Sequence, residues 1–360
     1  MVPQIKTRKK HKDKKPIYFL LAAIVVFGLF IYLITRPSTQ SKAVKELETS
    51  FNKKDIEMVW YKYKADLYQN EDFLYKIRER LTSFELTKEE VNECKGWLPP
   101  APVSLNIIVV PDLSRRIIDT INNPNQIASD IAVLNTIWDT FKASTKSKHD
   151  AKDKLSIDVT DINQAKGQFD KVANKLQFDL SEFKGKSNIL YFTENVDKQF
   201  ADNVKDMYTS ATQMPLGADY RFYLRRYLAN HLKENTLFDN FNNKVIMITD
   251  GYLEAENSIP DTKIYGYQKE LYAAVHFGNV AQTINSNHLN IPKVDIDLSN
   301  TEILVCEVNE RKVGKGYDFE VLDAYWSDWM KRMGVKKFKF LEREQASELT
   351  KKSIQSFIND

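Results

Sequence analysis

The distribution of hydrophobic and polar positions along this chain of 360 residues first shows a long apolar run near the N-terminus. Residues 17–35 contain no charged side chain, and their number is close to the roughly 20 residues that a helix needs to cross a bilayer. The end of the run, Leu33 to Pro37, lacks the small-x-small pattern of a signal-peptide cleavage site. We therefore expect a transmembrane helix over residues 17–36 that remains attached to the mature protein.

A basic tail precedes this run. Residues 1–16 carry seven Lys or Arg and a single acid, Asp13, whereas only Arg36, Lys42 and Lys45 follow the run closely. Positive charge favours the cytoplasmic side of a membrane-spanning helix. We expect a single-pass protein of the cytoplasmic (inner) membrane with its N-terminus inside and residues 37–360 outside, in the periplasm or the extracellular space.

The next segment, residues 37–102, has a helical pattern. It is dense in charge, contains no glycine before Gly96, and repeats apolar positions at steps of three or four residues. These positions include Val59, Tyr63, Leu67, Phe73, Leu74, Ile77 and Leu81. The pattern predicts a helical stalk, with a solvated linker of partly formed helix as the alternative. Pro99, Pro100 and Pro102 mark the boundary to the next domain.

Residues 103–360 alternate between strand-like and helical patterns, which indicates an α/β domain. Two runs, residues 104–110 and 244–249, are mostly apolar and do not alternate, as in central strands covered on both faces. We expect a doubly wound, mostly parallel sheet flanked by helices. The predicted strands are residues 104–110, 155–159, 188–192, 244–249, 302–308 and 337–341.

Helices are predicted between these strands from apolar residues at helical spacing. Their periodic stretches are residues 127–141, 169–176, 220–228 and 322–333. In the last of these, Trp326 and Trp329 belong to one face, which we interpret as core packing, and Gly334 is placed to end the helix.

Charge and cysteine content exclude several classes of protein. The net charge of +3 belongs to the basic tail, because the rest of the chain carries 45 basic and 48 acidic residues. Nucleic-acid binding is therefore not expected. Two cysteines provide neither a disulfide framework nor a zinc site. We expect Cys306 to be a small core residue and Cys94 to be exposed.

Carboxylates follow two of the predicted central strands. Asp112 and Ser114 come just after the first strand, Asp250 follows the fourth, and Asp219 stands at the start of the helix over residues 220–228. Asp219 alone is typical of a helix N-cap. If the fold brings the four residues together, their carboxylates repel one another unless a cation neutralises them. Hard oxygen ligands without His or Cys suit Mg²⁺, Mn²⁺ or Ca²⁺.

The order of these motifs resembles a von Willebrand factor A (vWA) domain over about residues 103–360. The resemblance rests on Asp112-x-Ser114 after a hydrophobic strand, a glycine-led loop into a helix, and ITDG at residues 248–251. It implies a variant metal-ion-dependent adhesion site in which Asp112 and Ser114 are ligands and Asp250 acts directly or through water. Asp219 stands where the family usually has Thr.

The chain departs from the family pattern at a second position as well. Arg116 replaces the second Ser of the family's DxSxS motif. Arg115 or Arg116 would then be able to point inward and pair with the carboxylates, leaving no room for a metal. A divalent cation and an arginine-filled site therefore remain open as alternatives.

The expected function is binding of a protein partner, as a membrane-anchored adhesion or assembly module and not as an enzyme. A long connection, residues 251–300, leaves from the edge that holds Asp250 and carries Tyr252, Tyr265, Tyr267 and Tyr272. We expect this insertion either to roof the acidic site and select the partner or to pack on the sheet. Two alternative functions remain: a Mg²⁺-dependent phosphoester hydrolase with Asp112 as nucleophile, and a scaffold subunit of an envelope complex.

Overall fold

The computed structural model describes residues 38–148, 152–160, 172, 174–183, 187–216, 218–253, 269–311, 317–343 and 347–360. They form two compact units that meet in sequence at Pro99 and Pro100. The basic tail and the predicted membrane helix, residues 1–36, lie outside the described residues. Among the helices that are described, none combines the length and the apolar character needed to span a bilayer.

The first unit consists of four helices, as the periodicity predicts: α2 Thr39–Glu48, α3 Lys53–Leu67, α4 Glu71–Thr82 and α5 Lys88–Trp97. Each helix begins after a residue whose side chain accepts a backbone N–H of the first turn, namely Ser38, Asn52, Asn70 and Thr87. The apolar positions of the predicted stripe are buried among these helices, and Trp60 stacks on Phe73. Residues 38–99 thus have a hydrophobic core of their own.

Cys94 is buried in this core, so the expectation that it is exposed was wrong. It lies three residues after Val91, and both side chains are on the inner face of α5. Position near a predicted boundary was a poor guide, because the spacing on the helix decides which face a side chain occupies.

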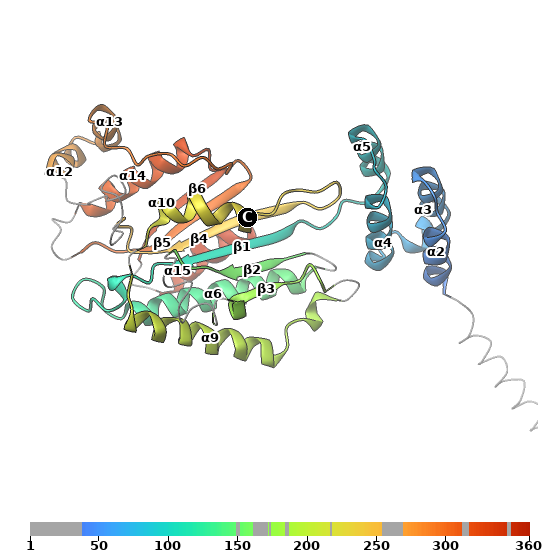
Figure 1. The fold of residues 1–360 in the computed structure, drawn as a ribbon, viewed down its shortest axis with the longest axis horizontal. Coiled ribbons are helices and arrows are strands. Elements are labelled where there is room, and N and C mark those ends of the chain that lie inside the picture. Colours follow the sequence, from blue (N-terminus) through green and yellow to red (C-terminus); the bar gives the residue numbers. More distant parts are fainter. Residues whose placement is uncertain are drawn as a thin grey trace, which may run out of the picture. The chain divides into compact units, whose positions relative to one another are not determined.

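The second unit is an α/β domain built on a six-stranded sheet in the order β3-β2-β1-β4-β5-β6 (Figure 1). The strands are β1 Ser104–Pro111, β2 Lys154–Ile157, β3 Gln177–Asp179, β4 Phe241–Ile248, β5 Thr301–Val308 and β6 Lys337–Glu342. All neighbouring strands are parallel except β3, which is antiparallel to β2. The predicted α/β class and mostly parallel sheet are confirmed.

Helices cover both faces of the sheet (Figure 1). On one face lie α6 Gln126–Lys146, α9 Glu194–Gln213 and α15 Ser347–Asn359. On the other lie α10 Tyr220–Tyr223, α12 Lys269–His276, α13 Val280–Ser286 and α14 Asp318–Arg332, and a π-helical turn, Leu224–Leu228, connects α10 to the short α11 Ala229–His231. Gly334 has a φ of 76° and ends α14 as predicted. Because both faces are covered, the three central strands are buried along nearly their whole length.

The segment between β2 and β4 differs from the sequence expectation. Residues 188–192 were predicted as a strand, but Asn188–Leu190 form a 3₁₀ turn, η3. The edge strand is instead the short β3, which follows a 3₁₀ turn at Asn174–Leu176 in the region predicted as helical. Helix α9 was not predicted at all. A short apolar run does not distinguish a strand from another buried segment, and Phe192 satisfies its burial by packing edge-on against Trp138 of α6.

Lys244 is an unusual residue for the middle of a buried strand. Its Nζ donates to Glu302 Oε2 on β5 at 2.9 Å and to the carbonyl oxygen of Phe357 near the end of α15 at 2.7 Å. Burial lowers the pKa of Lys244, and the hydrogen bond that it donates to Glu302 opposes this effect. The ammonium group therefore ties the C-terminal end of α15 to the sheet and fixes the position of this helix.

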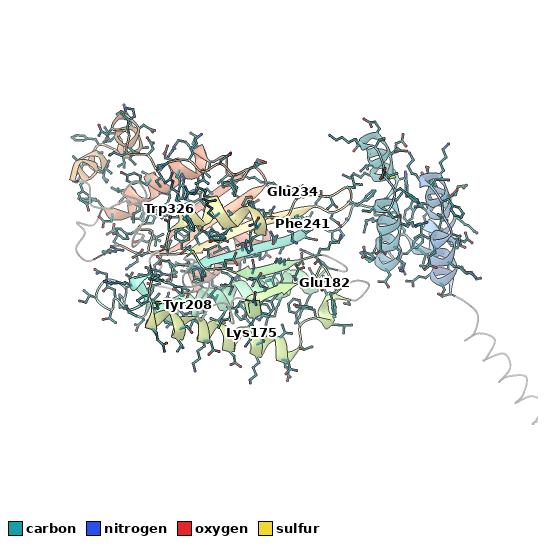
Figure 2. All side chains as sticks on the ribbon, in the orientation of Figure 1. Lys175, Glu182, Tyr208, Glu234, Phe241 and Trp326 are labelled. Atoms are coloured by element: carbon teal, nitrogen blue, oxygen red, sulfur yellow. The ribbon has the colours of Figure 1, made fainter. Side chains whose placement is uncertain are left out.

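The turn after β4 is fixed by Gly251. Its φ is 89°, and its carbonyl accepts a 2.9 Å hydrogen bond from the indole of Trp326, labelled in Figure 2. A Cβ atom at this position would lie 3.2–3.4 Å from side-chain atoms of Val308, Leu322 and Phe340. Only glycine fits both the backbone conformation and the space.

We predict that Gly251→Ala lowers the free energy of unfolding more than Gly278→Ala does. Gly278 also has a positive φ, 64°, but a Cβ there meets no atom within 4 Å, so its cost is the backbone strain of about 1–2 kcal/mol. Crowding at Gly251 adds about 1 kcal/mol or more. Urea unfolding of the two variants, followed by tryptophan fluorescence, measures the difference, and equal losses would show that Gly251 is not tightly enclosed.

Candidate functional site

The loop after β1 turns back under the carboxyl edge of the sheet. The chain leaves β1 with the Asp112 backbone N–H bonded to the carbonyl of Ile248 at the end of β4. Ser114 then begins a 3₁₀ turn, η1 Arg115–Ile117, by accepting a weak 3.4 Å hydrogen bond from the Arg116 N–H. This tight turn directs Arg116 into the protein, where its Nε donates to the carbonyl of Asp112 at 3.0 Å.

The guanidinium of Arg116 is buried between carboxylates from two elements. Its Nη2 lies 2.8 Å from Asp130 Oδ2 on α6 and donates to the carbonyl of Ile248 at 2.8 Å, while its Nε lies 3.3 Å from Asp112 Oδ2. Burial alone would lower the pKa of Arg116. The negative charges of Asp130 and Asp112 have the larger effect and raise this pKa above its usual value. Arg116 is therefore a permanent cation inside the domain.

Two hydroxyl groups complete this group of side chains. Thr249 Oγ1 donates to Asp112 Oδ2 at 2.9 Å, and the phenol of Tyr208, on α9 and labelled in Figure 2, donates to Asp130 Oδ2 at 3.0 Å. We refer to Asp112, Arg116, Asp130, Tyr208 and Thr249 as the Arg116 cluster. It connects β1, β4, α6 and α9 at the edge where α/β sheets hold their ligands.

Asp130 lies at the centre of a buried hydrogen-bond network. Burial raises its pKa to about 6, against the opposing effect of Arg116. In addition to Arg116 and Tyr208, it accepts a 2.7 Å hydrogen bond from Gln126 Nε2 at the first turn of α6. A carboxylate with this many donors is charged at neutral pH in a site from which water is largely excluded.

Asp112 and Asp250 lie close enough together for the charge of Asp112 to affect the pKa of Asp250. Burial and the charge of Asp112 raise the pKa of Asp250 to about 6. Asp250 Oδ1 accepts a long 3.4 Å bond from the Tyr252 N–H, and its Oδ2 lies 3.4 Å from Arg311 Nη2. The ends of β1 and β4 thus form an acidic centre with an arginine on each side.

Asp219 has a local role, as Ser114 does at the start of η1. Asp219 is the N-cap of α10 and accepts the Phe222 N–H at 2.8 Å. Among the described residues, no hydrogen bond or ion pair joins Asp219 to Asp112 or Asp250. The next residue, Tyr220, reaches the centre instead: its hydroxyl donates to the carbonyl of Val110, and burial together with Asp112 raises its pKa.

The arrangement does not fit a divalent cation as it stands. Asp112 Oδ1 accepts the Ser114 N–H at 2.9 Å, and its Oδ2 is occupied by Thr249 and Arg116. Within the described part of the chain, no three His, Cys, Asp or Glu side chains are grouped so as to hold a metal. The metal site of Asp112, Ser114, Asp219 and Asp250 stays a prediction, and the contacts favour the alternative in which Arg116 supplies the positive charge.

Sequence analysis did not identify three of the five residues of the Arg116 cluster. For Asp130 a signal was present, because it lies on the buried face of α6 together with Leu134 and Ile137, where an acid has to have a partner. Tyr208 gave no signal of its own, and Thr249 was noted only as part of the ITDG segment, since the roles of both depend on how α9 and β4 approach β1.

The tyrosines expected to roof the site divide into two groups. Tyr265 and Tyr267 lie outside the described residues. Tyr252 and Tyr272 both donate to the buried carboxylate of Asp318 at the start of α14. These two phenol groups therefore stabilise the packing of the insertion on the sheet, which is the alternative that the sequence left open.

The β1–α6 loop exposes two isoleucines. Ile118 and Ile121 are 47% and 68% exposed. Between them, Asp119 accepts the backbone N–H groups of Ile121 and Asn122, each at 3.0 Å. The hydrogen bonds of the Asn122 side chain and backbone also lower the pKa of Asp119. The loop is therefore held from inside by Arg116 and along its tip by Asp119 while presenting two isoleucines to the solvent.

Comparison with protein-family models and with curated protein sequences found no match to this chain.

The raised pKa of Asp250 predicts a dependence of stability on pH. Its folded value, about 6, is above the ordinary value of 3.8, so the folded state binds more protons between these values and the free energy of unfolding falls as pH rises from about 4 to about 6. We predict that Asp250→Asn reduces this fall by on the order of 2 kcal/mol. Asp130 contributes in the same direction and maintains the remainder.

Chemical denaturation at several pH values tests this, with the surface variant Asp202→Asn on α9 as control. Profiles of the Asp250→Asn variant and the unaltered chain that coincide would rule out Asp250 as a source of the pH dependence.

Proposed function

We propose that this chain is a membrane-anchored protein-interaction module with a vWA-like domain, and that it binds its partner through the β1–α6 loop. The observation that carries the proposal is this loop: two exposed isoleucines, Ile118 and Ile121, follow the buried Arg116, whose ion pair with Asp130 ties the loop to α6. Apolar side chains on a preorganised loop are suited to protein binding, because little conformational entropy is lost when the partner docks.

The arrangement of the domain supports the vWA-like interpretation. The sheet order β3-β2-β1-β4-β5-β6, with β1 and β4 adjacent at the centre, puts the Asp112-x-Ser114 and ITDG segments next to each other. The contact between Asp112 and Thr249 directly links these two motifs. In the proposed doubly wound fold, this is the edge at which ligands bind.

Arg116 explains how such a site would work without a bound metal. Its guanidinium contacts Asp112 and Asp130 and lies near enough to Asp250 to influence its pKa. It thereby supplies the positive charge that the family's metal ion would bring. We therefore propose that partner binding is independent of divalent cations.

The hydrolase alternative has less support. A nucleophilic carboxylate needs a free oxygen that is open to a substrate. Asp112 is 2% exposed, and both of its oxygens accept hydrogen bonds from the protein. These contacts suit a structural carboxylate.

The membrane anchor remains part of the proposal. A helix over residues 17–36 with a cytoplasmic basic tail would place both described units on the outer side of the cytoplasmic membrane. The interaction surface would then face a partner in the envelope or outside the cell.

We predict that a photo-reactive benzoyl-phenylalanine at position 121 of the full-length chain, irradiated in its native membranes, forms a defined adduct with one protein. The same group at position 189 serves as the control, because Ile189 is similarly exposed but lies on η3. Adding Ile118→Ser should reduce the adduct severalfold, because an apolar contact is lost, and EDTA should leave it unchanged.

Equal adducts from both positions would contradict the proposed surface. An adduct that disappears with EDTA would contradict the metal-independent mechanism and favour a cation at the Asp112 site.

A further inference from the structure

A cavity of about 680 Å³ opens at the same edge of the sheet, between α6, α15 and the ends of β5 and β6. Its volume is within the range of about 300–1,000 Å³ that is typical of ligand sites. It adjoins the Arg116 cluster through Gln126, which donates to Asp130 and accepts a 3.0 Å hydrogen bond from Arg343, a residue of the cavity wall. None of the five residues of the Arg116 cluster lines this cavity.

Glu307 is brought into this cavity by a β-bulge. Between the paired positions Val305–Phe340 and Val308–Glu342, β5 contains one residue more than β6. Strand alternation would place Glu307 on the face of Val305, towards α14, but the bulge, in which Glu307 has a φ of 66°, interrupts the alternation. Cys306 and Glu307 consequently both face α6. A non-glycine residue in this conformation is strained, and such strain is concentrated at functional sites.

The Glu307 carboxylate retains an open acceptor. Ser129 Oγ donates to Oε2 at 2.6 Å, and Arg343 Nε lies 3.4 Å from the same oxygen. Of the residues that the structure describes, none donates to Oε1. Glu307 is only 2% exposed and lines the cavity, so the little surface that it retains opens there.

The charge of the walls favours a cation over an anion. Three carboxylates, those of Glu307, Glu310 and Glu348, line the cavity together with two basic side chains. Arg343 already uses its guanidinium on Glu307, Gln126 Oε1 and the carbonyl of Pro124. Lys351 is exposed on α15. Glu307 Oε1 therefore presents negative charge to the cavity.

Part of the helical wall of the cavity is apolar. Ala132 and Val133 of α6 and Ile354 of α15 line the cavity together with Glu307. A long basic side chain lays its methylene stem along apolar surface and extends its charged head to an acceptor. The cavity offers both features to one such side chain.

We propose that this cavity receives a lysine or arginine side chain of the protein partner, whose cationic head binds Glu307 Oε1. The proposal rests on the function proposed above and adds a second recognition element beside the β1–α6 loop. A charge-assisted bond in a buried setting would supply specificity for a basic residue.

Isothermal titration of the full-length chain in detergent with single-residue probes tests this directly. Nα-acetyl-lysine amide and Nα-acetyl-arginine amide represent the two candidate side chains, and Nα-acetyl-norleucine amide has the apolar stem without the charge. We expect one cationic probe to bind with a dissociation constant on the order of millimolar, and norleucine amide not to bind measurably.

Glu307→Gln keeps the side-chain shape and should weaken binding of the cationic probe about tenfold or more. Glu320→Gln, on an exposed position of α14 away from the cavity, should leave it unchanged. Ala132→Trp narrows the cavity from the exposed side of α6 without altering Glu307 and should also abolish binding.

The inference is overturned if neither cationic probe binds, if norleucine amide binds equally well, or if Glu307→Gln remains folded and binds as the unaltered chain does. These failures are separable from failure of the proposed function, because the adduct at position 121 is measured without the probes. An adduct that persists while the probes do not bind would retain the interaction module and remove only its basic-residue pocket.

Discussion

The arrangement of this domain depends on one buried charge, the guanidinium of Arg116. Taking an arginine out of water is costly unless carboxylates and carbonyls replace the lost hydration. Asp130, Asp112 and the Ile248 carbonyl meet that requirement, and they come from three different segments. Each segment is therefore held in place by the same cation. At the directly paired ends of β1 and β4, the charge of Arg116 offsets the repulsion between Asp112 and Asp250.

The same network extends beyond the cluster towards β5 and β6. The side chain of Gln126 donates a hydrogen bond to Asp130 and accepts one from Arg343, and Arg343 in turn contacts Glu307. Glu307 is also among the charges that raise the pKa of Asp130. One buried polar network thus connects the proposed loop surface with the proposed cavity. A single partner would be able to contact both.

The sequence predicted the parts of the fold that depend on periodicity. The apolar runs at β1, β4 and β5, the helical stripe ending at Gly334, and the aspartates after the strands were all recognisable. Features decided by contacts between distant segments were not. Burial of Cys94 depends on how four helices pack, η3 replaces a strand where Phe192 meets Trp138, and the β-bulge at Glu307 arises from the register between β5 and β6. Arg116 was recognised as an alternative, but its main partner, Asp130, was not.

The central claim is that the guanidinium of Arg116 takes the place of a divalent metal ion at the strand-end site. A Mn²⁺ titration of the full-length chain, followed by electron paramagnetic resonance, tests this claim most directly. The account predicts that the unaltered chain binds no Mn²⁺ at this site, whereas Arg116→Ser, which removes the guanidinium and adds the hydroxyl of the DxSxS pattern, gains one bound ion. The account would be contradicted if the unaltered chain bound one Mn²⁺ and lost it on Asp112→Asn.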